Sequence, residues 1–318
     1  SLPIISLKFS FRGAGSINDT ADKQGLVQLL SNTMDEGAGD LTSQEFQKIL
    51  SDNSISLYFN SGRDNFGGQL KNLTRNQDKA FELLKLALTK PRFDEAPIER
   101  MRASNMARIK SSMGDPKWIA ARIYNDKVFE GHPYALNSGG TLTSLLKITP
   151  NDLRNHHQQY LTKDRLVIGV MGNISAEELK PILENTFGEL PTAKNKEVHK
   201  IADVANQGRV YLFKKDIPQT IIKIFHPSFD NTDPDYPALQ VLNYIYGGGG
   251  FGSRLMEEAR EKRGLTYGIY SQLYSLDHAN TLSISTSTKN ESVIEMLDII
   301  KNELTEISRN PVSEEELK

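Results

Sequence analysis

Residues 247–271 read GGGGFGSRLMEEAREKRGLTYGIYS, and this stretch indicates the fold and the function more directly than any other part of the chain. A run of glycines leads into a charged helix, and after the turn residue Gly264 comes a strand rich in aromatic residues. Arg260 lies on the expected helix and Tyr267 on the expected strand. This spacing lets a guanidinium and a phenol converge on one point from either side of the turn.

The order of elements around this stretch occurs twice in the chain. Two helices, two strands and a further helix follow one another in the first half, and the same order returns in the second half at an offset of about 210 to 214 residues. Five elements in the same order favour an internal duplication over chance. The expected pairs are 26–34 with 236–246, 43–50 with 253–262, 55–60 with 267–274, 66–73 with 281–287, and 80–88 with 294–307.

We therefore expect an α+β fold with two homologous domains, each a mainly antiparallel sheet covered by helices. The first spans residues 1–195 and the second residues 204–318, with a polar, lysine-rich linker within 191–203. The second domain is expected to be truncated. Ser313 and Glu316 form a capping box that opens a helix, and the matching helix near Ala96 is followed in the first domain by about 90 further residues.

Composition excludes several classes of protein and of site. The net charge of -2 gives no electrostatic basis for binding nucleic acid, and no apolar run approaches the roughly 20 residues that span a bilayer. The absence of Cys excludes disulfides, thiolate zinc ligands and cysteine nucleophiles. No signal peptide is visible, but the chain opens directly on an expected strand at 2–11, so we expect an upstream segment and a periplasmic location, with the cytoplasm as the alternative.

The glycine run and the two polar residues carry a resemblance to a known family. Together Gly247, Gly248, Gly249, Gly250, Arg260 and Tyr267 resemble the substrate-binding signature of the insulinase-type zinc peptidases, the group of mitochondrial processing peptidase and pitrilysin. The segment 131–134, Gly-His-Pro-Tyr, extends this resemblance into the first half. The resemblance implies two domains of the processing-peptidase fold, a glycine loop near the substrate, and Arg260 and Tyr267 as residues that hold a peptide.

The zinc motif that this family carries on the first helix of its first domain is missing. The family motif is His-x-x-Glu-His, in which two histidines bind zinc and the glutamate is the general base. At the matching positions this chain has Gln28, Ser31 and Asn32, and by alignment Arg108 occupies the position of the third ligand. Amides are poor zinc ligands and an arginine repels the ion, so we expect no metal site in this chain. None of its six histidines forms a helical pair four residues apart, and we expect them to be surface or capped residues.

Simpler interpretations of the same residues remain open. Arg260 is surrounded in sequence by charged residues and is on this view one more solvated helix charge, while Tyr267 is ordinary strand sequence. Residues 247–252 satisfy G-x-G-x-x-G, but they follow a helix rather than a strand, which disfavours a dinucleotide site, and four glycines can also form a mobile turn. The strand at 66–73 is either a sheet edge that takes up an extended peptide or a normally paired strand.

Two functions of different classes follow. In the first, the chain is the non-catalytic, substrate-binding subunit of a heterodimeric zinc peptidase, whose partner subunit brings His-x-x-Glu-His, the zinc and the general base. In the second, the chain is a peptidase-like scaffold or interaction protein without a proteolytic role. The missing ligands disfavour a third possibility, an autonomous metallopeptidase.

Overall fold

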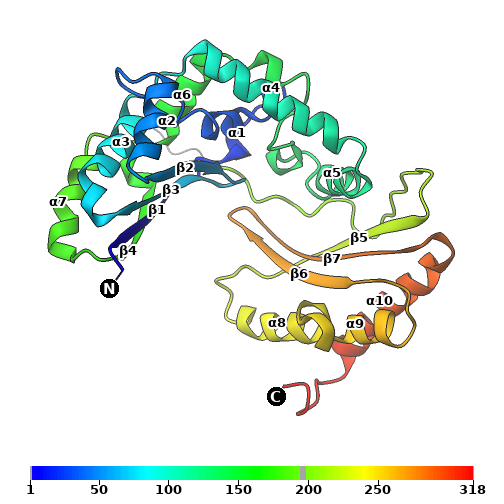
Figure 1. The fold of residues 1–318 in the computed structure, drawn as a ribbon. Helices are drawn as coiled ribbons and strands as arrows, with labels where there is room; N and C mark the ends of the chain where they lie inside the picture. Colours follow the sequence, from blue (N-terminus) through cyan, green and yellow to red (C-terminus); the bar gives the residue numbers. More distant parts are fainter. Residues whose placement is uncertain (1, 194–197, 318) are drawn as a thin grey trace. The chain divides into compact units, whose positions relative to one another are not determined.

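The computed structural model describes residues 2–193 and 198–317, and the chain divides into two compact units (Figure 1). The first unit consists of Ser1–Ser112 and Leu136–Val198, and the second of Met113–Ala135 and His199–Lys318. Segment 113–135 thus belongs spatially to the second unit, although chain order had assigned it to the first domain. Part of the expected linker, 194–197, lies outside the described residues.

The first unit contains one antiparallel sheet. Strands β1 (Ile4–Arg12), β2 (Ser56–Ser61), β3 (Asn65–Leu73) and β4 (Leu166–Gly172) are arranged in the order β2-β3-β1-β4. Side chains of β1 alternate between a buried and a more open face, because successive residues of a strand point to opposite sides. Strand β3 pairs on both sides, so of the two alternatives for 66–73 the normally paired strand is the correct one.

Helices cover the buried face of this sheet. Phe9 and Phe11 of β1 pack there with Leu29 and Leu30 of the first helix in one hydrophobic core. Capping boxes fix where several helices begin, for example Ser175 with Glu178 at the start of α7. The helices are α1 (Leu26–Ser31), α2 (Ser43–Asp52), α3 (Gln77–Thr89), α4 (Glu95–Ser112), α6 (Pro150–Tyr160) and α7 (Ala176–Phe187).

The second unit contains a three-stranded antiparallel sheet. Strands β5 (Gln219–Pro227), β6 (Ile269–Leu276) and β7 (Ala279–Lys289) are arranged in the order β5-β7-β6, the same order as β1-β3-β2 in the first unit. Helix α8 (Tyr236–Asn243) continues as a π-helix over Tyr244–Gly248, and α9 (Arg254–Met256) continues as a π-helix over Glu257–Glu261. Helix α10 (Val293–Arg309) completes the unit. The hydrogen bonds of the expected capping box at Ser313 form, but residues 314–317 make a turn rather than a helix.

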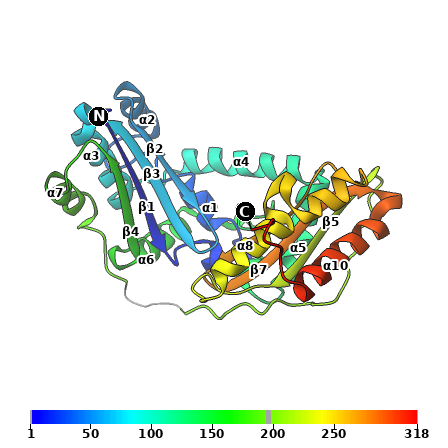
Figure 2. The ribbon, with the colours of Figure 1, turned by 90° about the horizontal axis from the view of Figure 1, so that it is seen from below.

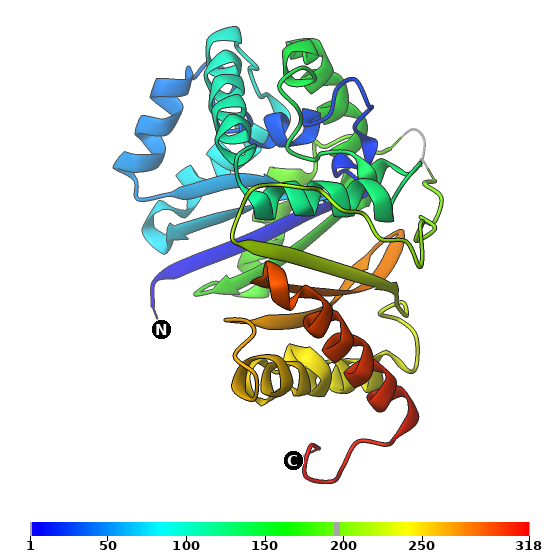
Figure 3. The same ribbon diagram turned by 90° about the vertical axis from the view of Figure 1, so that its right-hand side faces the viewer.

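Helix α5 (Pro116–Val128) covers one side of the second sheet, and α8, α9 and α10 lie on the other (Figure 3). The ring of Tyr124 in α5 meets Phe225 of β5 edge-on at 5.7 Å between centroids. Strand β7 places the small Ser283 beside Phe225, which leaves room for the helix. The chain therefore has the expected α+β fold with antiparallel sheets. No helix in 2–193 or 198–317 is long and apolar enough to cross a membrane.

Candidate functional site

The glycine run forms an ordered helical turn pressed against strand β6. Gly247 is buried, and a Cβ at this position would lie 2.7 Å from Ser271 Oγ and 2.9 Å from its backbone nitrogen. Ser271 Oγ in turn donates a hydrogen bond of 2.7 Å to Asn243 Oδ1 of α8. Only glycine allows this close approach of helix and strand, so the run has a packing role that a mobile turn lacks.

The remaining glycines complete the turn and lead into the next helix. Gly248 ends the π-helix, Gly249 follows it, and Gly250 has φ +65°, a left-handed conformation that favours glycine. Ser253 Oγ donates to the Gly250 carbonyl at 2.8 Å, just before α9 begins. The turn follows a helix, so it lacks the strand-to-helix setting in which G-x-G-x-x-G binds a dinucleotide.

Arg260 is held by an aromatic ring of this turn. Its guanidinium carbon lies 4.4 Å from the centroid of the Phe251 ring, a cation–π distance. The carboxylate paired with it is that of Glu261, 3.6 Å from Arg260 Nε, which is beyond hydrogen-bond distance. The side chain of Arg260 is one-third exposed and Phe251 is two-thirds exposed. The ring therefore holds the guanidinium near the surface by a contact that uses none of its N–H hydrogen-bond donors.

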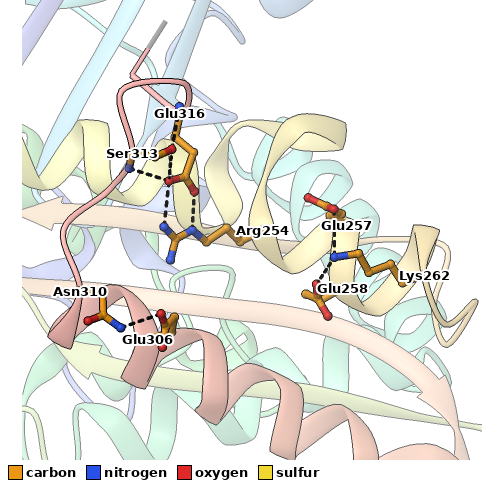
Figure 4. Close-up of polar contacts among 8 residues, drawn as sticks. All are labelled: Arg254, Glu257, Glu258, Lys262, Glu306, Asn310, Ser313 and Glu316. Carbon is orange, nitrogen blue, oxygen red and sulfur yellow. Dashed lines mark hydrogen bonds and ion pairs between the residues drawn. The ribbon is translucent and has the colours of Figure 1, made fainter.

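The neighbouring charges of the same helix are paired with one another (Figure 4). Lys262 Nζ lies 2.5 Å from Glu258 and 3.0 Å from Glu257, and Arg263 also pairs with Glu258. These contacts keep the pKa of Glu258 below its usual value. Arg260, which lies against Phe251, therefore has different surroundings from the neighbouring charges of this helix.

Arg254, at the start of α9, is also committed to a carboxylate (Figure 4). It binds Glu316 through two hydrogen bonds, 2.6 Å from Nε and 3.0 Å from a terminal nitrogen. This bidentate pair, with the capping bonds from Ser313, lowers the pKa of Glu316 to about 2. Of the three arginines in this segment, Arg260 is thus the one whose hydrogen-bond donors are not engaged by a carboxylate within the described residues.

Tyr267 lies in the turn before β6, not on the strand as expected from the sequence, because β6 begins at Ile269. Its side chain is 87% exposed, and Gly264 with φ +64° turns the chain ahead of it. Within the part of the chain that the structure describes, Arg260 and Tyr267 make no hydrogen bond or ring contact with each other. Both present polar donors at the surface, but the structure does not bring the two groups together.

Amide side chains occupy the position of the missing zinc motif. Gln28 Nε2 on α1 lies 3.3 Å from Ser31 Oγ and 3.4 Å from Asn32 Oδ1, and the Ser31 hydroxyl donates to the Gln28 carbonyl at 2.8 Å. Asn105 of α4 donates from Nδ2 to Asn32 Oδ1 at 3.0 Å. The structure thus brings Gln28, Ser31 and Asn32 together and adds Asn105, which was not identified from the sequence.

Arg108 lies one turn beyond Asn105 on α4, at the edge of this cluster. It is exposed and reaches the cluster only through a hydrogen bond of 3.4 Å to Asn105 Oδ1. Asn105 is therefore the residue of α4 that contacts Asn32 directly, and Arg108 reaches the cluster through Asn105. The donor set of three amides and a hydroxyl does not fit a zinc ion, which requires imidazole, thiolate or carboxylate ligands. Residues 2–193 and 198–317 contain no group of three His, Asp or Glu side chains that could hold a metal.

Two of the histidines that we expected to be surface or capped residues are buried. His156 and His157 of α6 lie in the first unit, where their Nε2 atoms bond to the carbonyls of Ala14 and Leu88 at 3.2 and 2.8 Å. Burial lowers the pKa of both, that of His156 to about 4. They are neutral structural residues at physiological pH, and each carbonyl accepts from a ring N–H.

Comparison with known proteins gives a consistent result. Residues 147–318, just over half of the chain, match the family model described as "Peptidase M16 inactive domain". The "Non-peptidase homolog YmxG" of Helicobacter pylori is 27% identical over 305 residues, which cover 94% of this chain and 70% of that protein. The "Probable inactive metalloprotease YmfF" of Bacillus subtilis is 23% identical over 254 residues, 78% of this chain and 59% of that protein. The crystal structure of a peptidase M16 inactive domain from Pseudomonas fluorescens superimposes with a TM-score of 0.92 at 26% identity, covering 100% of this chain and 77% of that one.

Proposed function

Because the chain belongs to the peptidase M16 family, we propose that it is the substrate-binding subunit of a heterodimeric zinc peptidase. A partner subunit of the same family supplies the His-x-x-Glu-His motif, the zinc ion and the general base. This chain supplies Arg260 and Tyr267, which hold the peptide over the partner's zinc. We further propose that the complex works in the periplasm, with the cytoplasm as the alternative, which fractionation of cells would decide.

The chain is not itself a peptidase. The matched family model describes an inactive domain, and relatives are named as a non-peptidase homologue and as a probable inactive metalloprotease. The amide cluster of Gln28, Asn32 and Asn105 agrees with this conclusion, because it offers none of the ligands that zinc requires. The expectation of an inactive member of the insulinase-type family is therefore confirmed.

The proposal rests on the contacts of Arg260 compared with those of the neighbouring arginines. Phe251 orients its guanidinium, and carboxylates engage the neighbouring arginines instead. A planar guanidinium with its donors available can bind a peptide carbonyl and the oxyanion that forms from it during hydrolysis. The exposed phenol of Tyr267 offers a second donor from the turn that follows the same helix.

A reconstituted complex tests the proposal. The partner is a His-x-x-Glu-His protein that co-purifies with this chain, and mixing the two should give zinc-dependent peptide cleavage that neither shows alone. Arg260→Ala should then lower kcat/KM by about 10- to 1000-fold. Arg263→Ala is the matched control on the same helix, since that side chain is already paired with Glu258, and it should change kcat/KM by less than about threefold.

The same experiment separates the two classes of function. Equal activity of the Arg260→Ala and wild-type complexes would remove the substrate-binding role. A stable complex in which this chain raises no peptidase activity would favour the scaffold instead.

A further inference from the structure

The first sheet has one face that the helices of its own unit leave open. Figure 2 looks onto strands β1 to β4, with most helices of the unit behind them. Lys8 and Ser10 of β1 lie on this face, and across β3 the side chains of Tyr58 and Asn60 of β2 are exposed on it too. Val167 and Met171 of β4 are also exposed there, because they pair in register with Ser10 and Ser6. The face therefore combines polar groups with two apolar side chains, in contrast to the wholly hydrophobic side that packs on the helices.

This open face carries positive charge only. None of the four strands contains an Asp or Glu, whereas Lys8, Arg12 and Lys71 are all exposed on them. The strand register places all three cations on the same side of the sheet. None of the three is in an ion pair with another described residue. The chain as a whole has a net charge of -2, so this local excess of cations is a feature of the face.

A hollow of about 330 Å³ lies at the centre of the face. Lys8 pairs in register with Gln69 on one side and with Gly169 on the other, so a cation stands beside a position without a side chain. A Cβ at Gly169 would meet no atom within 4 Å, and this leaves the floor of the hollow open. The Tyr58 hydroxyl donates to Gln69 Oε1 at 2.7 Å, which fixes one wall.

We propose that this face binds acidic segments of peptides, with a carboxylate side chain seated in the hollow beside Lys8. Carboxylates match the three cations in charge, and the hydroxyl and amide groups around Lys8 can donate further hydrogen bonds to them. The inference rests on the proposed function in that it takes the ligand to be a peptide, and it assigns the class of peptide that the subunit selects.

Peptide binding to the full chain tests this assignment. The probes are two fluorescent peptides of equal length, one rich in Glu and one rich in Lys, followed by anisotropy at low ionic strength. The Glu-rich peptide should bind and the Lys-rich peptide should not, and salt should weaken the binding. Lys8→Glu should raise Kd at least about tenfold, because it replaces an attraction by a repulsion. Lys180→Glu makes the same change of charge on α7, a helix that packs against α3, and should alter Kd by less than about twofold.

A second variant tests the hollow without changing any charge. Gly169→Val fills the floor of the hollow, yet meets open space and suits a strand, so thermal melting should show an intact fold. It should raise Kd for the Glu-rich peptide at least about tenfold by excluding the carboxylate. Wild-type affinity in both Lys8→Glu and Gly169→Val, or an equal loss in Lys180→Glu, would overturn the assignment. The assay needs no partner, so its failure is distinct from a failure of the reconstituted peptidase.

Discussion

Tyr134 is the anchor that binds segment 113–135 to the second sheet, and its removal should loosen that sheet selectively. The side chain is 1% exposed, and its ring meets Phe129 edge-on at 5.6 Å between centroids. Its hydroxyl oxygen accepts a hydrogen bond of 3.2 Å from the backbone nitrogen of His278, in the turn between β6 and β7. All of these residues belong to the second unit.

The expected loss of stability follows from this burial. Replacing a buried aromatic side chain by alanine costs about 3–5 kcal/mol, since it removes apolar contacts and leaves a cavity. Tyr134→Ala should therefore lower the stability of the second unit by about that amount. Tyr134→Phe keeps the ring and removes the hydroxyl that accepts the hydrogen bond from His278, and about 1 kcal/mol is expected per hydrogen bond lost.

Hydrogen exchange read by mass spectrometry locates the effect. In Tyr134→Ala, peptides from β6 and β7 should exchange faster, while those from β1 and β3 keep their wild-type protection. Leu84→Ala is the complementary variant, because Leu84 is fully buried in the core of the first unit, and it should give the opposite pattern. If Tyr134→Ala loosened the first sheet as much as the second, the assignment of 113–135 to the second unit would be refuted.

Two further predictions concern the first unit. Burial depresses the pKa of His156 to about 4 from the ordinary value of about 6.5. As the pH falls, the unfolded chain therefore binds the proton first, and about 3 kcal/mol of folding free energy is lost between pH 6.5 and pH 4. Urea titrations at several pH values should show that His156→Gln makes the stability less dependent on pH. The second prediction compares two triple variants that both carry Gln28→His and Asn32→His. The variant that adds Asn105→Glu should bind zinc at least about tenfold more tightly than the one that adds Arg108→Glu, because Asn105 contacts Asn32 directly. Competition with a chromophoric chelator measures the two affinities, and equal values would contradict the geometry.

Local signals in the sequence were sufficient for most elements of the fold. Ser175 and Glu178 predicted the start of α7, and the structure shows the capping box there. Strand β5 was missed because helices lie on both sides of its sheet, so Ile221 and Ile222 are both largely covered and the alternation typical of a half-buried strand is absent. Periodicity alone identifies such strands poorly.

Long-range contacts account for the other differences. The place of segment 113–135 depends on pairs such as Tyr134 with His278, which are far apart in the chain and leave no local pattern. The part of Asn105 in the amide cluster was missed for a related reason, because its hydrogen bond to Asn32 joins residues 73 positions apart in the chain.

The charges around Arg260 bear most directly on function. A peptide carbonyl that approached Arg263 or Arg254 would have to displace a carboxylate that is already bound, whereas the carboxylate paired with Arg260, that of Glu261, lies beyond hydrogen-bond distance. The guanidinium carbon of Arg260 lies over the Phe251 ring at 4.4 Å from its centroid, and this cation–π contact involves no hydrogen-bond acceptor. Arg260 therefore differs in its surroundings from the other arginines of the segment, although the sequence presents all of them as similar helix charges. Phe251, a residue of the glycine turn, makes this contact and so connects the turn with the helical segment that carries Arg260.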